Sequence, residues 1–342
     1  MKKQFVMAVL SAAILSGCAV KEVCPPSTRV NIPVSEVPGN SSDKYSAIIL
    51  PAEVEFDDKA AVRISKKLTS LIENEVSKTG TKVVDRSLAK KLKDEIRLAE
   101  STGKYNSHKV PVADFAIITD VNGANFNHSF KEAYTWVDDE GKKHYVPASC
   151  RYSAEVTGIT KIVSMPSMET LARIELDGDD SQSRDTRNSN CPYTKEDYNS
   201  MLTVAAKNAL TRADQKIKNA LAPVGVVMEM RSCDTADMVK VSIGSKRNVE
   251  PKQTVLLTSR EKVDDGDGNI EIETRQYGDG YVVDNKNDAI KAKYSWVVID
   301  KEIAKQVQKG DTAKTDFNGI CDGNDFTEYL CNTATETADK IF

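Results

Sequence analysis

The stretch Val83-Val84-Asp85-Arg86-Ser87-Leu88 decides how the first half of the chain is organised. A short apolar strand over 82–85 passes directly into a helix, with Ser87 as the predicted N-cap. An apolar face and a terminating glycine define that helix: Leu88, Leu92, Ile96, Ala99 and Gly103. The stretch therefore predicts a strand-to-helix unit that ends near residue 103.

Similar elements lie on both sides of this stretch. Before it, residues 45–50 have the pattern of a buried strand, and a helix capped by Asp57 or Asp58 is predicted to end at Gly80. After it, a third strand is predicted over 115–121. The order strand, helix, strand, helix, strand favours an α/β sheet.

The next segment predicts long strands followed by one long helix. Strands are expected over 125–136 and 145–163, and a returning strand over 171–176. The strongly polar stretch 177–190 is expected to be a loop, and a helix is expected over 195–221.

From Val224 onward the predicted structure is entirely β. Short alternating apolar runs separated by Gly- and Asp-rich turns are typical of a small barrel or sandwich. Val249 to Gln253 and Val307 to Asp311 are steps of a kind common in SH3-like barrels. Phe317 to Phe342 is expected to be a tail.

The strand-to-helix stretch also carries a family resemblance. It continues through Leu92, Glu95 and Leu98 into Ala113-Asp114-Phe115-Ala116-Ile117-Ile118. This pattern resembles the domain of the curli-secretion (CsgG-like) lipoprotein family, whose plan also occurs in lipoprotein activators of penicillin-binding proteins and in the amino domain of TolB. It covers about 45–221 and implies a fold rather than an activity. Together with the β region, it is similar to the middle and carboxy domains of flagellar assembly protein T, whose family builds part of a ring around the flagellar motor.

These patterns and resemblances predict a defined domain order. A CsgG-like α/β sandwich domain is expected at 45–222, and a small all-β domain, an SH3-like barrel, at 223–316. A cysteine-containing tail is expected at 317–342.

The amino terminus has the pattern of an export signal. Met1-Lys2-Lys3 is positively charged, 5–15 is apolar, and Leu15-Ser16-Gly17-Cys18 resembles the lipobox of bacterial lipoproteins. We expect a signal peptide at 1–17, lipidation of Cys18, and a lipidated tether at 18–44. The resemblance implies three acyl chains on Cys18, and Ala19 in place of an Asp implies export to the outer membrane. The expected location is therefore the outer membrane, on its periplasmic side.

Composition excludes some classes of partner. The net charge is −4, with 47 basic against 51 acidic residues, which argues against nucleic acid and against a polybasic membrane patch. After Cys18 no apolar run is long enough for a transmembrane helix.

Six further cysteines are disulfide candidates in an exported protein: Cys24, Cys150, Cys191, Cys233, Cys321 and Cys331. Their number allows about 15 pairings, which the sequence leaves open. Cys321 with Cys331 is the most local option, and Cys150 with Cys191 would join a strand to the start of a helix.

The sequence contains no pattern of catalytic chemistry. His108, His128 and His144 are not spaced as metal ligands, and no nucleophile elbow or phosphate-binding loop occurs. The acidic run 264–269 fails the spacing of a calcium loop and suits a hairpin turn. We therefore expect no enzymatic activity, cofactor, metal or small-molecule substrate.

Two functional classes remain. The first is a periplasmic scaffold or assembly lipoprotein that binds other envelope proteins, as a homo-oligomer or ring component. The alternative is a secretion channel like that of the curli system, with 124–156 and 170–190 as candidate membrane strands. Such strands need an apolar side of about 9–11 residues. Charged residues at 138–143 interrupt the first segment, and the second is strongly acidic.

Overall fold

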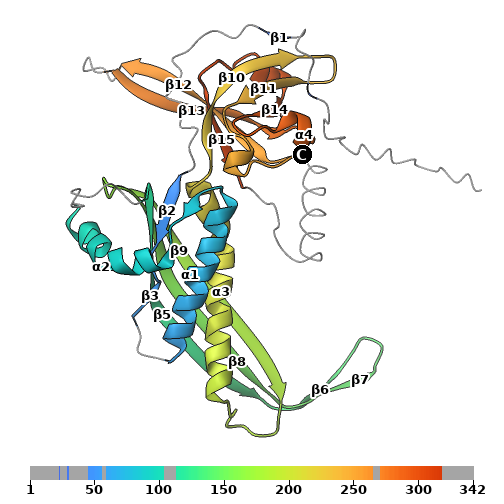
Figure 1. The fold of residues 1–342 in the computed structure, drawn as a ribbon. Helices are drawn as coiled ribbons and strands as arrows, with labels where there is room; N and C mark the ends of the chain where they lie inside the picture. The colour runs from blue at the N-terminus through green and yellow to red at the C-terminus, as the bar shows by residue number, and fades with distance from the viewer. Residues whose placement is uncertain are drawn as a thin grey trace, which may run out of the picture.

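The computed structural model describes residues 23, 29–30, 45–55, 59–103, 113–264 and 270–317. Within them, a mixed sheet covered by helices is followed by a small closed β-barrel (Figure 1). The predicted order of elements over 45–121 is confirmed.

The first sheet has the strand order β4-β2-β5-β8-β9, and β3 pairs with β5 as well. β2 runs parallel to β4 and β5, whereas β5, β8 and β9 are antiparallel. The strands are β2 (Ser46–Ile49), β3 (Glu53–Val54), β4 (Lys82–Val83), β5 (Phe115–Lys131), β8 (Ser149–Ser164) and β9 (Thr170–Asp185).

Helices cover both faces of the parallel half of this sheet. They are α1 (Lys59–Lys78), α2 (Arg86–Thr102) and α3 (Lys195–Ala220). Ala47 and Ile49 pack with α1 and α3, whereas Ile48 and Leu50 pack with α2. Alternate residues of a strand face opposite sides, so burial on both faces explains the continuous apolar run of this strand.

The start of α2 differs from the prediction. Asp85, rather than Ser87, is the N-cap: its backbone is not helical and its carboxylate accepts the Ser87 N–H at 2.7 Å. Ser87 lies in the first turn, and its hydroxyl also donates to Asp85. Asp85 occupies the cap position because the N-cap residue directly precedes the first helical residue, Arg86. Gly103 ends the helix in the left-handed region, as predicted. The predicted caps Asp57 and Asp58 lie outside the described residues.

The predicted loop at 177–190 is wrong, because β9 continues to Asp185 opposite Ser149. A Cβ on Gly178 would lie 2.1 Å from the Ala209 backbone nitrogen of α3, so strand and helix are in direct backbone contact. The acidic residues that suggested a loop lie largely on the exposed side of a paired strand.

α3 begins where the sequence indicates. Thr194 is its N-cap, and Asp197 completes a capping box with the Thr194 backbone. The predicted strands on either side of the turn at 138–142 are each divided in two, because β6 (Tyr134–Val137) and β7 (Lys143–Val146) form a separate two-stranded sheet.

The second sheet closes into a barrel. Its order is β10-β11-β14-β13-β12-β15, and β15 pairs back onto β10. The six strands are β10 (Val224–Ser232), β11 (Asp237–Val241), β12 (Thr254–Asp264), β13 (Ile270–Val282), β14 (Ser295–Ile299) and β15 (Thr312–Asp316). Short helices α4 (Lys286–Ala289) and α5 (Lys301–Ala304) and the 3-10 turn η2 (Ser245–Arg247) connect them. Of the two predicted β architectures, the barrel is confirmed.

Part of the predicted tether belongs to this barrel. β1 (Arg29–Val30) adds to β10 antiparallel, with Arg29 opposite Arg231 and Val30 opposite Met230. The sequence predicts a lipidated tether over 18–44, but β10 offers an unpaired edge that a short extended segment of it can join.

The two sheets meet at a polar junction. Arg247 is only 4% exposed, and its guanidinium lies 4.3 Å from the centre of the Tyr45 ring. Burial lowers the pKa of Arg247, although Tyr45 and Asp114 oppose that effect. Asn248 Nδ2 donates to the Ser77 carbonyl at 3.0 Å, and a Cβ on Gly80 would lie 2.6 Å from the Arg247 carbonyl carbon. These contacts hold the barrel against the carboxyl end of α1.

Candidate functional site on an extended arm

The α/β sheet extends into a three-stranded arm, which we define as 122–131 of β5, 149–158 of β8 and 177–185 of β9. Within the described residues, β5 beyond Val121 has β8 as its strand partner, since β2 and β3 end earlier. In Figure 1 the arm runs along α3 toward the end of the molecule opposite the barrel.

Only one face of the arm is apolar. Cys150, Tyr152, Ala154 and Val156 are buried toward α3. Their neighbours Arg151 and Glu155 are exposed on the other face, opposite a row of Asn and Ser residues on β5. This alternation is that of a sheet with one face in the core and one in water.

Aromatic rings and a disulfide hold the arm to the start of α3. The Phe126 ring lies 4.8 Å from that of Tyr193 and 5.1 Å from that of Tyr198. The Tyr152 hydroxyl donates to the Pro192 carbonyl at 2.9 Å. Cys150 and Cys191 form a disulfide across the same contact, with Cα atoms 5.4 Å apart. The end of the arm is therefore fixed to the helix rather than free to bend.

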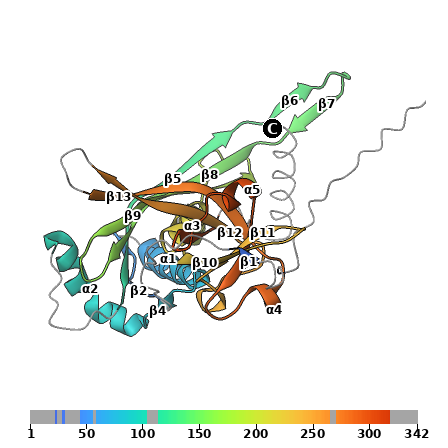
Figure 2. The same ribbon diagram turned by 90° about the horizontal axis from the view of Figure 1, so that it is seen from above.

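The hairpin of β6 and β7 projects from the end of this arm (Figure 2). Large apolar side chains are exposed on it: Tyr134 (55%), Trp136 (47%), Val137 (56%) and Tyr145 (69%). Trp136 is paired across the strands with His144, and the two rings stack with centroids 4.5 Å apart. Thr135 pairs with Tyr145, so both faces of the hairpin carry an aromatic ring.

A network around Asp138 shapes the turn of the hairpin. Asp138 Oδ1 accepts the Lys142 N–H at 2.8 Å, and Asp138 Oδ2 lies 2.6 Å from His144 Nε2. The hydrogen bond with His144, followed by that from Lys142, lowers the pKa of Asp138. An isolated two-stranded hairpin is only marginally stable in water. These hydrogen bonds fix the conformation of its turn.

The hairpin concentrates exposed apolar surface. Nine large hydrophobic side chains are exposed in the described part of the chain, and four of them lie in its two short strands. Clustered exposed apolar residues mark interaction sites more often than scattered ones do, and Tyr and Trp are enriched in the centres of protein interfaces. No sequence motif singles out these residues. The sequence feature that could have indicated the hairpin surface is the presence of aromatic residues on both sides of an acidic turn.

The outer edge of the arm is partly covered. Asn208 Nδ2 donates to the Asp179 carbonyl at 2.8 Å, and Arg212 Nη1 to the Asp177 carbonyl at 3.3 Å. These α3 side chains occupy the carbonyl groups that a further strand would need at the middle of β9. Lateral strand addition is therefore blocked there, and the hairpin remains the accessible apolar element of the arm.

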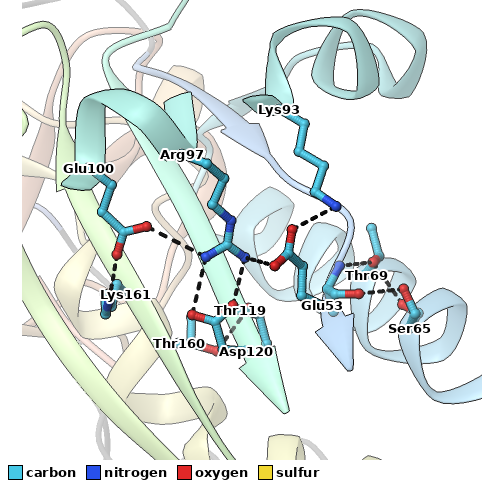
Figure 3. A network of polar contacts seen from close by, with 11 residues as sticks. Glu53, Ser65, Thr69, Lys93, Arg97, Glu100, Thr119, Asp120, Thr160 and Lys161 are labelled. Carbon is cyan, nitrogen blue, oxygen red and sulfur yellow. Dashed lines mark hydrogen bonds and ion pairs between the residues drawn. The ribbon is translucent and has the colours of Figure 1, made fainter. Parts of the chain in front are cut away.

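A second polar cluster joins α2 to the sheet (Figure 3). Arg97 contacts Asp120 at 2.6 Å, Glu100 at 3.5 Å and Glu53 at 3.6 Å. Lys93 pairs with Glu53 at 2.6 Å, and Lys161 pairs with Glu100. Three carboxylates and three cations balance one another, so the cluster has the character of a structural clamp rather than of an acid–base site.

The predicted site residues are distributed as follows. Cys18, Cys24, Cys321 and Cys331 lie outside the described residues, whereas Cys233 is disulfide-bonded. His128 lies beside Tyr193 on the arm, with ring centroids 5.6 Å apart. His108 and most of the acidic run 264–269 are outside the described residues. In the part that is described, no three His, Cys, Asp or Glu side chains are grouped as metal ligands. None of the helices described there has the length and apolar character that crossing a bilayer requires.

No family model and no curated protein sequence matches this chain. Among solved structures, it is similar to the hypothetical protein CT253 from Chlamydia trachomatis, at 8% identity and a TM-score of 0.30, over 52% of this chain and 98% of that one. It is similar to lipoprotein GNA1162 from Neisseria meningitidis, at 15% identity and a TM-score of 0.20, over 49% and 99%. It is similar to the PelC dodecamer from Paraburkholderia phytofirmans, at 10% identity and a TM-score of 0.22, over 53% of this chain and 94% of that one. Three of the matching structures are described as bacterial lipoproteins. Likeness this low assigns neither a family nor a function to this chain.

Proposed function

We propose that this chain is a periplasm-facing outer-membrane lipoprotein that acts as a non-enzymatic assembly component of an envelope machine. The hairpin of β6 and β7 is its partner-binding element, and the exposure of Tyr134, Trp136, Val137 and Tyr145 carries the proposal. The lipobox at Leu15-Ser16-Gly17-Cys18 supports the anchor. In this proposal the chain consists of a signal peptide, a lipidated tether, an α/β domain, a barrel domain and a tail, in that order.

The position of β1 supports an orientation. Cys18 and Arg29 are separated by at most about 40 Å of fully extended chain, so an anchored Cys18 keeps the barrel near the membrane. The hairpin lies at the opposite end of the molecule (Figure 1). α3 alone, along which the arm runs, spans about 39 Å. The hairpin would therefore reach away from the outer membrane into the periplasm.

The chemistry of the hairpin favours a protein as its partner. Asp138, Asp139 and Glu140 at the turn give it an acidic tip, with Lys142 and Lys143 beside them. An acidic tip is repelled by anionic lipid headgroups, whereas aromatic residues inside a rim of mixed charge are typical of protein interfaces. The partner would be another envelope protein or a further copy of this chain.

Crosslinking in living cells tests the proposal. The triple variant Tyr134→Ser, Trp136→Ser, Tyr145→Ser should lose the crosslinked complex that the unchanged chain forms. Leu98→Ser with Leu171→Ser is the matched control, because these apolar side chains are exposed elsewhere. We expect this control to retain the complex.

Two results would overturn the proposal. One is an unchanged chain that crosslinks to no envelope protein and stays monomeric. The other is a hairpin variant that crosslinks as well as the control does. Ion conductance by the purified protein in planar bilayers would favour the channel alternative instead.

A further inference from the structure

We propose that a groove between α1 and α2 is a binding site for an anionic amphiphile, a small molecule with an apolar body and a negatively charged head. The groove has a volume of about 890 Å³, within the range of about 300–1,000 Å³ found for small-molecule sites. No local sequence pattern indicates this groove, because the residues that line it come from β2, β3, α1 and α2.

The shortness of β4 opens the groove. β4 pairs only with Ser46 and Ala47, so among the described residues no strand covers the outer edge of the chain from 48 to 54. α1 and α2 lie on opposite faces of the sheet and form the two walls beside this edge. The groove thus lies beyond the carboxyl end of a parallel strand, where α/β sheets commonly bind ligands.

The main-chain groups at the floor of the groove are not available to pair with an added peptide strand. The Ala52 N–H donates to Thr69 Oγ1 at 3.1 Å, and the Ser65 hydroxyl donates to the Ala52 carbonyl at 2.6 Å (Figure 3). Pro51 beside it has no N–H to offer. Because strand addition depends on free main-chain groups, recognition beside Pro51 and Ala52 comes from side chains.

The walls combine apolar surface with excess positive charge. Val54, Ala61 and Ala89 supply apolar lining. The lining also contains four cations, Lys66, Arg86, Lys90 and Lys93, against a single carboxylate, Glu53.

Two of these cations are already neutralised. Lys93 pairs with Glu53, and Arg86 pairs with Glu73 on α1. The side chains of Lys66 and Lys90, one on each wall, form no hydrogen bond or ion pair among the described residues. In a chain of net charge −4, two uncompensated lysines facing one cavity favour a ligand with a negative head. The apolar lining between the helices suits an alkyl or ring body.

Calorimetry with defined probes tests this site. The mature chain with Cys18→Ser is titrated in the absence of detergent with dodecyl phosphate, dodecanoate, inorganic phosphate and the zwitterion dodecylphosphocholine, all below micelle-forming concentrations. We expect one equivalent of dodecyl phosphate or dodecanoate to bind in competition with each other. Inorganic phosphate and the zwitterion should bind at least about tenfold more weakly.

Matched variants place the binding in the groove. Lys66→Gln with Lys90→Gln should weaken dodecyl phosphate binding about tenfold, which corresponds to about 1.4 kcal/mol. Lys67→Gln with Lys91→Gln removes the same charge from adjacent exposed positions outside the lining and should leave binding unchanged. Ala61→Phe should block the groove, and circular dichroism verifies that each variant is folded.

Three outcomes would overturn the inference. The unchanged chain could bind none of the four probes. The two lysine pairs could have equal effects, which would place binding elsewhere or make it non-specific. Inorganic phosphate could bind as tightly as dodecyl phosphate, which would exclude recognition of an apolar body.

Discussion

Removal of the Cys150–Cys191 disulfide should destabilise the α/β part of the molecule and loosen the arm that carries the hairpin. The bond joins residues 41 positions apart. For a loop of this length the chain-entropy relation gives about 13 cal/mol/K, or about 4 kcal/mol at 25 °C. Domains have stabilities of roughly 5–15 kcal/mol, so the loss is large but need not unfold the chain.

The perturbation is Cys150→Ala with Cys191→Ala. Both side chains are buried, so alanine introduces no unpaired polar group. Urea unfolding is followed by far-ultraviolet circular dichroism, because the three long helices all belong to the α/β part. With an m value of roughly 2 kcal/mol/M, the midpoint should fall by about 2 M. With Trp136→Phe introduced in both chains, the fluorescence of the buried Trp296 follows the barrel, which should unfold at an unchanged urea concentration.

A decrease of less than about 1 kcal/mol in the free energy of unfolding of the α/β part would refute this reasoning. The aromatic contacts alone would then close the loop between Cys150 and Cys191. An equal shift in the fluorescence of Trp296 would also contradict it, since the disulfide lies in the arm and not in the barrel.

Three further substitutions test other parts of the structure. Gly178→Ala should cost about 1–3 kcal/mol or more in urea unfolding, because its Cβ would overlap the α3 backbone, whereas exposed Ser181→Ala on the same strand should cost little. Asp85→Ala should cost about 1 kcal/mol by loss of the α2 cap, and Ser87→Ala clearly less; the reverse order would restore Ser87 as the cap. Burial raises the pKa of Asp311, against hydrogen bonds from Gln308 N–H and Tyr277 Oη. The contribution of Asp311 to the free energy of unfolding is therefore complete below the unfolded pKa of about 3.9 and is lost as pH rises through the folded pKa. An asparagine side chain does not titrate, so the stability of Asp311→Asn relative to the unchanged chain should increase between about pH 3 and pH 7. A stability difference that is constant over this range would contradict the raised pKa.

The elements that the sequence predicts well are those with a local physical cause. Apolar residues at helical spacing, the Thr194 cap and the terminating Gly103 specify helices without reference to distant parts of the chain. The alternation after Val224 predicts short strands, and the pairing of β15 with β10 decides between barrel and sandwich. That pairing joins residues about ninety positions apart and leaves no local trace in the sequence.

The sequence-based predictions that fail do so because of contacts between distant parts of the chain. The acidic residues of 177–185 suggested a loop, but Gly178 brings β9 into contact with α3, and Asn208 and Arg212 bind its outer carbonyl groups. The groove depends on how far β4 extends, which its sequence does not specify. The candidate site was missed because Tyr134 and Trp136 have the alternation of an ordinary half-buried strand. Only the structure places them on a hairpin outside the core.

A photo-crosslinking amino acid in the hairpin reveals whether the hairpin contacts a partner in the cell. It is introduced at Tyr145, which is 69% exposed, and as a control at Leu171, which is 46% exposed at the other end of β9. After irradiation of living cells, we expect position 145 to give a discrete crosslinked envelope protein, or a crosslinked copy of this chain, and position 171 to give none. Equal labelling from both positions, or no product from position 145 in a correctly anchored protein, would contradict it.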